Sequence, residues 1–260
     1  MQDKITVGFF DSGIGGISVM TRARMKLPSA DYIYYADTDH VPYGLKTREQ
    51  IIEYSDDAIE CLISHGAQAV VVACNTATSM AIEHLRAKYN LPIIGIEPAV
   101  KPAAKLHSDE KILVCATPVT IGGEKLHSLI ENMGIHPTLA ATPGLVTLAE
   151  NAEFDTDKVC RYLETVIDRK ANYSAVVLGC THFSYFRDSF RVFFGDDIDI
   201  IDGTEGVVNR LIDVLGVYNN NDPSTVRGNV TYIRSGSPVK DKKDIAFFEM
   251  LADRIRNEYK

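Results

Sequence analysis

The chain has 260 residues, of which 27 are basic and 35 acidic, so its formal net charge is −8. This excess of acidic residues argues against a nucleic-acid-binding surface. No apolar run approaches the roughly 20 residues of a membrane helix, and residues 1–5 lack the apolar segment of a signal peptide. We therefore expect a cytoplasmic protein with no membrane partner. Five cysteines without a Cys-x-x-Cys pair predict free thiols rather than a zinc site or a disulfide framework.

Strand-like apolar runs alternate with amphipathic segments along the chain, which is typical of parallel sheets flanked by helices. The expected strands are 4–10, 31–36, 69–73, 92–96, 111–116, 137–141, 174–179 and 198–201. One helix should begin at the capping box of Thr47 and Gln50 and end at Gly66, which suits a left-handed helix stop. Another should begin near Asp155 and end near Asn172.

The two halves of the chain resemble each other at a fixed offset. Cys74 and Cys180 each end a β-rich run and lie 106 residues apart, and the same offset relates Asp11 to Thr117 and Gly66 to Asn172. This repeat predicts two α/β domains related by a pseudo-twofold axis, with the active site in the cleft between them. After Asp202 we expect a helix at 205–216, a strand at 229–234 and a helix at 244–259, none of which has a partner in the repeat.

We therefore expect a discontinuous first domain, formed by residues 1–97 and 206–260, and a second domain at residues 98–205. Ligands of open parallel sheets bind beyond the carboxyl ends of the strands. The loops expected there are rich in hydroxyls, amides and glycines, and several precede helices, whose free N–H groups can bind a carboxylate.

The candidate reactive groups also admit plainer interpretations. A lone cysteine at a strand end is usually a small buried hydrophobe, but two at matched positions before helix starts favour reactive thiols. Asp11 and Ser12 could form a simple helix cap, and His182 could be structural or could manage the Cys180 proton. Two opposed proton-transfer groups are what inversion of a stereocentre requires, and this pairing is the main indication of function.

At this point the sequence resembles the cofactor-independent glutamate racemases of the aspartate/glutamate racemase superfamily. The matching segments are Phe10-Asp-Ser-Gly-Ile-Gly-Gly16, Asp37 with Pro42-Tyr-Gly44, Ala73-Cys-Asn-Thr-Ala-Thr78, Ala116-Thr-Pro-Val-Thr120, Gly179-Cys-Thr-His182 and Ile201-Asp202. They occur in the family's order between residue 5 and about residue 205. The chain departs from the family at Phe183-Ser-Tyr185, and after Thr120, where it has Gly122, Gly123 and His127.

The resemblance implies an enzyme that interconverts L- and D-glutamate without a cofactor or metal and supplies D-glutamate for cell-wall peptidoglycan. It implies that Cys74 takes the α-proton from the D-enantiomer and Cys180 from the L-enantiomer. Asp11, His182 and Glu150 would assist the two thiols. The implied substrate-binding residues are Asp11, Ser12, Pro42, Tyr43, Gly44, Asn75, Thr76, Thr117, Thr120, Thr181 and His182.

Two other functions stay open at the level of the sequence. A relative within the superfamily could act on another substrate such as aspartate, although the Asp-Ser-Gly-x-Gly-Gly opening favours glutamate. A non-catalytic ligand-binding or redox-sensing protein could instead join its paired thiols in a disulfide. The oligomeric state is also open, a homodimer included.

Overall fold

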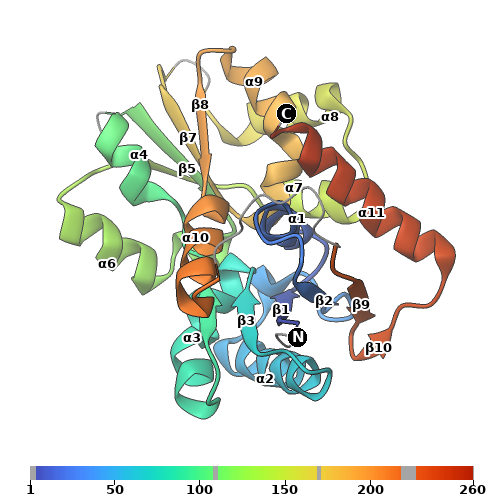
Figure 1. Cartoon of the computed structure of the whole chain (residues 1–260). Helices are drawn as coiled ribbons and strands as arrows, with labels where there is room; N and C mark the ends of the chain where they lie inside the picture. Colours follow the sequence, from blue (N-terminus) through green and yellow to red (C-terminus); the bar gives the residue numbers. More distant parts are fainter. Residues whose placement is uncertain (1–3, 108–110, 169–170, 218–226, 260) are drawn as a thin grey trace. The chain divides into compact units, whose positions relative to one another are not determined.

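The computed structural model describes residues 4–107, 111–168, 171–217 and 227–259. Tertiary contacts divide the chain into two compact units, Met1–Ile96 with Thr204–Lys260, and Glu97–Gly203. Each unit contains a sheet of mostly parallel strands flanked by helices, as the alternating sequence pattern predicts (Figure 1). The nine strands expected from the sequence, the one at 229–234 included, are all present, each within two residues of its predicted bounds.

The first unit has a six-stranded sheet in the order β10-β9-β2-β1-β3-β4. Its strands are β1 (Thr6–Asp11), β2 (Asp31–Ala36), β3 (Ala69–Val72), β4 (Ile93–Gly95), β9 (Val230–Arg234) and β10 (Ser237–Pro238). All neighbours pair in parallel except β9 and β10. The central strands β1 and β3 are almost wholly buried, because helices cover both faces of the sheet.

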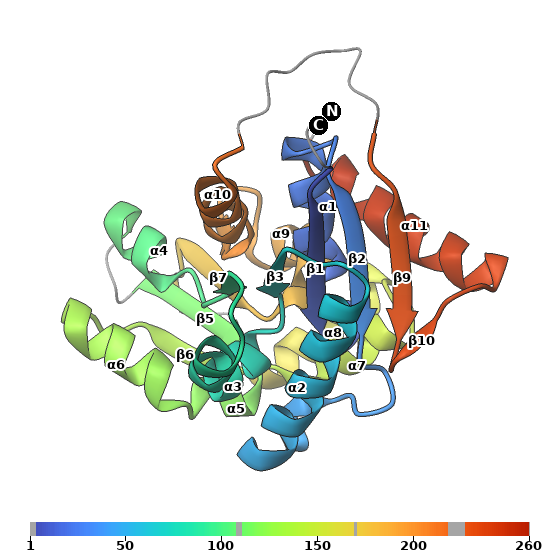
Figure 2. The ribbon, with the colours of Figure 1, turned by 60° about the horizontal axis from the view of Figure 1, so that its bottom comes forward.

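The helices of the first unit are α1 (Ile17–Lys26), α2 (Arg48–Ser64), α3 (Asn75–Lys88), α10 (Thr204–Leu215) and α11 (Lys242–Asn257), with a 3-10 turn η1 at Tyr43–Leu45. Figure 2 shows α2 in front of this sheet and α1 and α11 behind it. The predicted limits of α2 are confirmed. Thr47 and Gln50 form the reciprocal capping box, and Gly66 adopts φ +90° just after the helix.

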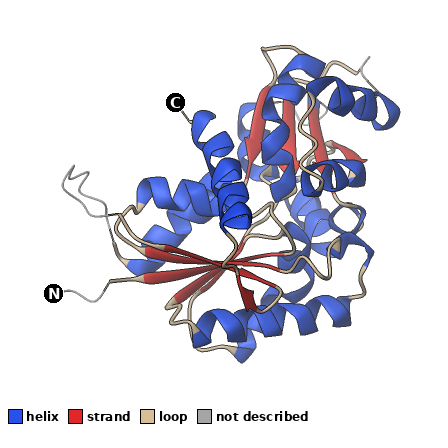
Figure 3. Cartoon of the chain, turned by 90° about the vertical axis from the view of Figure 1, so that its right-hand side faces the viewer, coloured by secondary structure: helices blue, strands red, loops and turns tan. Residues whose placement is uncertain are grey.

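The second unit has a four-stranded parallel sheet in the order β6-β5-β7-β8. Its strands are β5 (Ile112–Ala116), β6 (Thr138–Ala141), β7 (Ala175–Gly179) and β8 (Asp199–Asp202). Its helices are α4 (Val100–Leu106), α5 (Pro118–Ile121), α6 (Glu124–Met133), α7 (Pro143–Glu150), α8 (Thr156–Val166) and α9 (Arg187–Phe194), with a 3-10 turn η3 at Thr181–Phe186. In Figure 3 helices again flank the strands of this sheet.

The four strands of the second sheet follow the same order as four strands of the first. The order β2-β1-β3-β4 recurs as β6-β5-β7-β8, so the offset seen in the sequence is an offset between equivalent strands. The first sheet is wider because β9 adds in parallel to β2 and β10 adds to β9. The central pairs β1–β3 and β5–β7 are therefore equivalent, and the loops that follow them are the ones expected to carry chemistry.

One predicted helix end is wrong. The sequence placed the end of the helix that starts after Asp155 near Asn172, but α8 ends at Val166. Ile167 leaves the helix in an extended conformation (φ −126°, ψ 131°) and is buried. Asn172 is not among the described residues with positive φ. Burial of the β-branched Ile167 side chain ended the helix earlier than the Asn signal did.

Candidate active site

Asp11, Ser12 and Cys74 lie together at the carboxyl edge of the first sheet. β1 and β3 are neighbours with Phe10 opposite Val72, so the residues that follow the two strands are adjacent. Asp11 has no exposed surface and Cys74 is 5% exposed. The Cys74 thiol points at Ser12 Oγ, with the two atoms 3.5 Å apart.

Cys74 also forms the N-cap of α3. Its Sγ accepts a hydrogen bond from the backbone N–H of Ala77 at 3.4 Å, in place of the usual hydroxyl or carboxylate cap. The helix dipole and the free N–H groups of the first turn favour negative charge at this position. The site is therefore suited to a thiol that cycles through a thiolate.

The loop after β1 needs glycine because the backbone approaches its neighbours closely. A methyl group on Gly16 would lie 2.7 Å from Asp11 Cβ and 2.9 Å from Ala73 Cβ. Asp11 Oδ1 accepts a hydrogen bond from Gly13 N–H at 2.9 Å, and Tyr34 donates its hydroxyl to the Gly13 carbonyl at 2.7 Å. The predicted tight turn therefore packs closely against Asp11 and against Ala73, the residue before Cys74.

Tyr43 is buried beside the same edge and its hydroxyl donates to Asp37 Oδ2 at 2.6 Å. Burial, followed by the Asp37 carboxylate, raises the pKa of Tyr43, so the phenol stays protonated. Asp37 also bonds His40 Nδ1 at 2.8 Å and accepts from Ser235 Oγ at 3.3 Å. The sequence motif identified Asp37 without assigning it a role. Its position after β2, one strand from Asp11, was the available signal that it anchors the Pro42-Tyr43-Gly44 loop.

The first turn of α3 provides further polar groups. Asn75 and Thr76 are 5% and 3% exposed. Asn75 Oδ1 is buried and has no hydrogen-bond partner in the part of the chain that the structure describes. An orphaned buried acceptor is costly unless a ligand satisfies it, so this oxygen is a candidate for contact with an N–H or O–H donor of a ligand.

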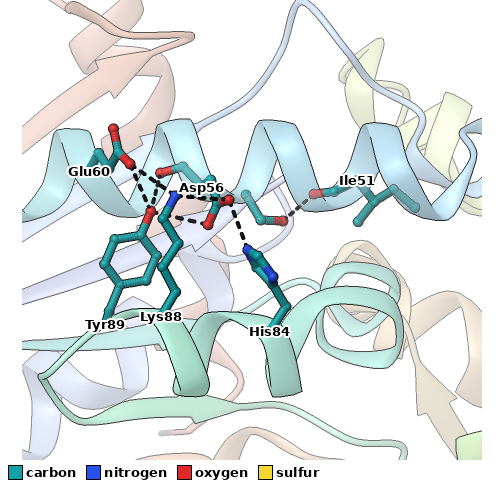
Figure 4. A network of polar contacts seen from close by, with 7 residues as sticks. Ile51, Asp56, Glu60, His84, Lys88 and Tyr89 are labelled. Carbon is teal, nitrogen blue, oxygen red and sulfur yellow. Dashed lines mark hydrogen bonds and ion pairs between the residues drawn. The ribbon is translucent and has the colours of Figure 1, made fainter.

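A polar network holds the far end of α3 against α2 (Figure 4). Asp56 of α2 is bonded by His84 Nε2 at 2.9 Å, by Lys88 Nζ at 3.1 Å and by the Tyr89 hydroxyl at 3.1 Å. Lys88 and Tyr89 also reach Glu60. Because α3 starts at Cys74 and α2 follows the Tyr43 loop, this network fixes two helices that begin beside the site.

At the equivalent edge of the second sheet, Thr117 and Cys180 follow the paired strands β5 and β7. Thr117 caps α5, where its Oγ1 accepts from Thr120 N at 3.3 Å and donates to Thr120 Oγ1 at 3.0 Å. Thr181 is 4% exposed. These hydroxyls form a compact group at one sheet edge, on a helix start suited to an anion.

The Cys180 thiol belongs to a short chain of polar groups. Its Sγ lies 3.7 Å from His182 Nδ1, and His182 Nε2 lies 2.5 Å from Glu150 Oε1 at the end of α7. His182 is 2% exposed and the Glu150 side chain 18%. Burial opposes a charge on His182, but the bonds to Cys180 and Glu150 outweigh it and raise the His182 pKa well above its ordinary value. This arrangement supplies a cation beside the thiol.

The residues of Phe183-Ser-Tyr185, which depart from the family pattern, are buried in the second unit. Phe183 and Tyr185 are 0% and 1% exposed. Ser184 donates to Asp202 Oδ2 at 3.2 Å, and Arg187 Nη2 reaches the same oxygen at 2.6 Å. Asp202, which belongs to the matching segment Ile201-Asp202, therefore stabilises the 3-10 turn η3 that follows Cys180.

The predicted site residues thus form two groups, one at the carboxyl edge of each central strand pair. The first contains Asp11, Ser12, Pro42, Tyr43, Gly44, Cys74, Asn75 and Thr76, and the second contains Thr117, Thr120, Glu150, Cys180, Thr181 and His182. Among the described ranges, no group of three His, Cys, Asp or Glu side chains could hold a metal ion. No helix in those ranges is long and apolar enough to cross a membrane.

A family model described as Asp/Glu/Hydantoin racemase matches residues 17–211. A glutamate racemase of Lachnospira eligens is 45% identical over 259 residues, which cover 96% of this chain and 97% of that protein. Glutamate racemase 2 of Bacillus subtilis (strain 168) is 44% identical over 252 residues, with 94% of each chain covered.

Solved structures of glutamate racemases are also similar to this chain. The Escherichia coli glutamate racemase in complex with L-glutamate and the activator UDP-MurNAc-Ala superposes with a TM-score of 0.82 at 27% identity, covering 96% of this chain and 95% of that one. The Campylobacter jejuni glutamate racemase superposes with a TM-score of 0.80 at 26% identity, covering 96% of this chain and 98% of that one. These likenesses extend through both units.

Proposed function

The chain belongs to the Asp/Glu/Hydantoin racemase family, and we propose that it racemises glutamate by passing the α-proton between Cys74 and Cys180. Glutamate is the substrate in the names of the relatives that match nearly its whole length. The observation that carries the two-thiol mechanism is that each of the two equivalent sheet edges presents one buried cysteine at the end of its central strand pair.

Inversion at Cα needs one group to remove the proton and another to return it on the opposite face. In this proposal Cys74 deprotonates D-glutamate and Cys180 deprotonates L-glutamate, and the thiol that did not act as base is the acid. The mechanism requires the two sulfurs to reach opposite faces of one Cα. Each elementary step transfers one proton from carbon to sulfur or from sulfur to carbon. After one racemisation the cysteine that acted as base is protonated and the cysteine that acted as acid is a thiolate.

The α-proton of glutamate is weakly acidic, so the carbanionic carboxylate needs strong stabilisation. Positioned acid and base groups contribute only about 10²–10⁴-fold, and fixed hydrogen-bond donors aimed at the developing charge contribute the larger share. The hydroxyls of Thr117, Thr120 and Thr181 and the helix start at Asn75 and Thr76 are the groups assigned to this task. Ser12 and the Pro42-Tyr43-Gly44 loop are assigned to the rest of the substrate.

The supporting residues differ between the two thiols. The bonds to Cys180 and Glu150 raise the pKa of His182, which places a cation 3.7 Å from the Cys180 sulfur. Asp11 lies at the Cys74 edge, where the negative charge of a carboxylate disfavours a nearby thiolate and a cation between them removes that effect. We assign Asp11 to the substrate ammonium, so that its charge is balanced when Cys74 must be negative.

Isotope exchange in D₂O tests the assignment of each thiol. The native protein should convert L-glutamate to a racemic mixture with deuterium at Cα. Cys74→Ser should lose racemisation but still exchange the α-hydrogen of L-glutamate, and Cys180→Ser should exchange only that of D-glutamate. Cys61→Ser, which alters a half-buried helical thiol, is the matched control. Full racemisation by either active-site variant would remove the two-thiol mechanism.

The same experiment distinguishes the other two functions. A substrate other than glutamate, aspartate first, would show faster exchange than glutamate in the same assay. A redox-sensing protein would instead lose both free thiols to one disulfide on oxidation and show no isomerisation.

The peptidoglycan role is tested by restoring growth of a bacterial strain that requires D-glutamate. A cytoplasmic location and a homodimer stay predictions.

A further inference from the structure

The helix that carries Glu150 begins without the cap that its sequence offers. Thr142 is the N-cap of α7, but its hydroxyl makes no cap hydrogen bond and has no partner among the described residues. Pro143 has no N–H, so the N–H of Gly144 is the first donor that the helix leaves free. That donor bonds to the Tyr162 hydroxyl of α8 at 2.9 Å.

The contact between Gly144 and Tyr162 is close as well as polar. A methyl group on Gly144 would lie 2.4 Å from Tyr162 Cε2 and 2.5 Å from Cζ, so only glycine lets the ring approach the helix start. Burial raises the pKa of Tyr162 more than the Gly144 bond lowers it, so the hydroxyl stays protonated at neutral pH. The α8 side chain thus fixes the first turn of α7 by shape and by hydrogen bonding.

Fixing the first turn of α7 also fixes its last residue. The helix has eight residues and buries Leu145, Leu148 and Ala149, so it moves as one body about 12 Å long. At its other end Glu150 bonds His182 at 2.5 Å, and His182 faces Cys180. A charge-assisted bond this short is sensitive to small displacements of either partner.

We propose that Tyr162 is a positioning residue of the racemase, which holds α7 so that Glu150 keeps His182 aimed at the Cys180 thiol. This inference rests on the proposed function, in which Cys180 exchanges a proton with substrate. Tyr162 acts through the helix, and within the described part of the chain its hydroxyl bonds Gly144 rather than Cys180 or His182. A shift of α7 lengthens the Glu150–His182 bond, weakens the charge on His182 and so removes the cation that faces the Cys180 thiol.

The test compares Tyr162→Phe with Tyr32→Phe. Tyr32 is another tyrosine whose hydroxyl bonds a backbone group, in its case by donating to the Leu27 carbonyl at 2.7 Å, but it lies in the first unit near the start of β2. Both variants lose one hydroxyl and one hydrogen bond to the backbone and keep the ring. Gly144→Ala displaces the same contact from the other side and serves as the second variant at the proposed position.

The readout is the rate at which iodoacetamide alkylates Cys180 and Cys74 at each pH, measured by peptide mass spectrometry without substrate. In Tyr162→Phe and Gly144→Ala the alkylation midpoint of Cys180 should rise and that of Cys74 should stay unchanged. kcat should fall roughly fivefold, equivalent to about 1 kcal/mol, with KM changed less than twofold. Tyr32→Phe should alter neither midpoint.

An unchanged Cys180 midpoint in Tyr162→Phe, or equal shifts at both cysteines, overturns the proposal. Failure of the underlying mechanism gives a different result, because Cys180→Ser would then retain racemisation whatever Tyr162→Phe does. If Gly144→Ala does not fold, Tyr162→Phe decides alone, since it adds no atom to the packed contact.

Discussion

Replacing Glu150 by Gln tests the electrostatic arrangement around Cys180. The substitution keeps the shape of the side chain and removes its charge. His182 then loses the carboxylate that helps to raise its pKa, while the burial that opposes its charge remains. The histidine therefore becomes neutral at a lower pH than in the native protein, and Cys180 loses its adjacent cation.

The expected loss of stability follows from the burial of the pair. Removing one partner of a fully buried ion pair costs about 3–5 kcal/mol when the other charge stays. Here the Glu150 side chain is 18% exposed, and His182 can release its proton. Both effects lower the cost, so we expect about 1.5–3 kcal/mol, the range for a hydrogen bond to a charged group.

The sign of the pH dependence is set by the raised pKa of His182. A group whose folded pKa lies above its unfolded value stabilises the protein fully below the unfolded value, about 6.5 for histidine. That stabilisation is lost as the pH rises through the folded pKa. The native protein should therefore exceed Glu150→Gln in stability most at pH 6, and the difference should shrink toward alkaline pH.

Urea unfolding at pH 6 and at a series of higher pH values measures this difference, and steady-state kinetics measure kcat. We expect kcat to fall by about 10²-fold, the lower end of general acid–base contributions, because His182 itself remains. Glu153→Gln is the control, since Glu153 pairs with Lys158 on the surface and should contribute at most about 1 kcal/mol. A stability loss that is the same at every pH, or an unaltered kcat, would refute the assigned charge on His182.

Three further substitutions test the first half of the site. Gly16→Ala forces a methyl group to within 2.7 Å of Asp11 Cβ and should cost about 1–3 kcal/mol in urea unfolding together with a lower kcat/KM; native-like values would contradict the close approach. Asp11→Asn should change kcat unequally for L- and D-glutamate, while kcat/KM stays equal in both directions because the enantiomers have equal free energy; negligible effects on both kcat values would argue against a substrate contact. Asp56→Asn should lower stability by about 1 kcal/mol at pH 7. Burial opposes the negative charge of Asp56, but its bonds to His84 and other α3 partners lower its pKa, so the native advantage should shrink as the pH falls below about 3.9 and vanish below the folded pKa, and an advantage that does not shrink with acidification would contradict it.

Much of the fold follows from periodicity and end signals in the chain. The central strands β1, β3, β5 and β7 are almost wholly buried because helices cover both faces of each sheet, and the strand runs predict the strand bounds within two residues. The α2 limits were equally clear, since a capping box and a glycine at φ +90° act locally. The end of α8 was less clear, because the burial of Ile167 is a tertiary effect that overrides the helix-stop signal of Asn172.

The sequence by itself determined the strand positions of the repeat, the two cysteines at strand ends and the helix starts beside them, because these depend on local pattern and on the rule that ligand loops follow parallel strands. It made His182 a candidate through its place beside Cys180, and Glu150 only through resemblance. Their 2.5 Å contact, the Asp37–Tyr43 bond and the Tyr162 cap on Gly144 join residues 32, 6 and 18 positions apart, and only the tertiary structure decided them. The physical reason is that a side-chain hydrogen bond depends on how helices pack, and helix packing is decided by the whole core rather than by any one segment.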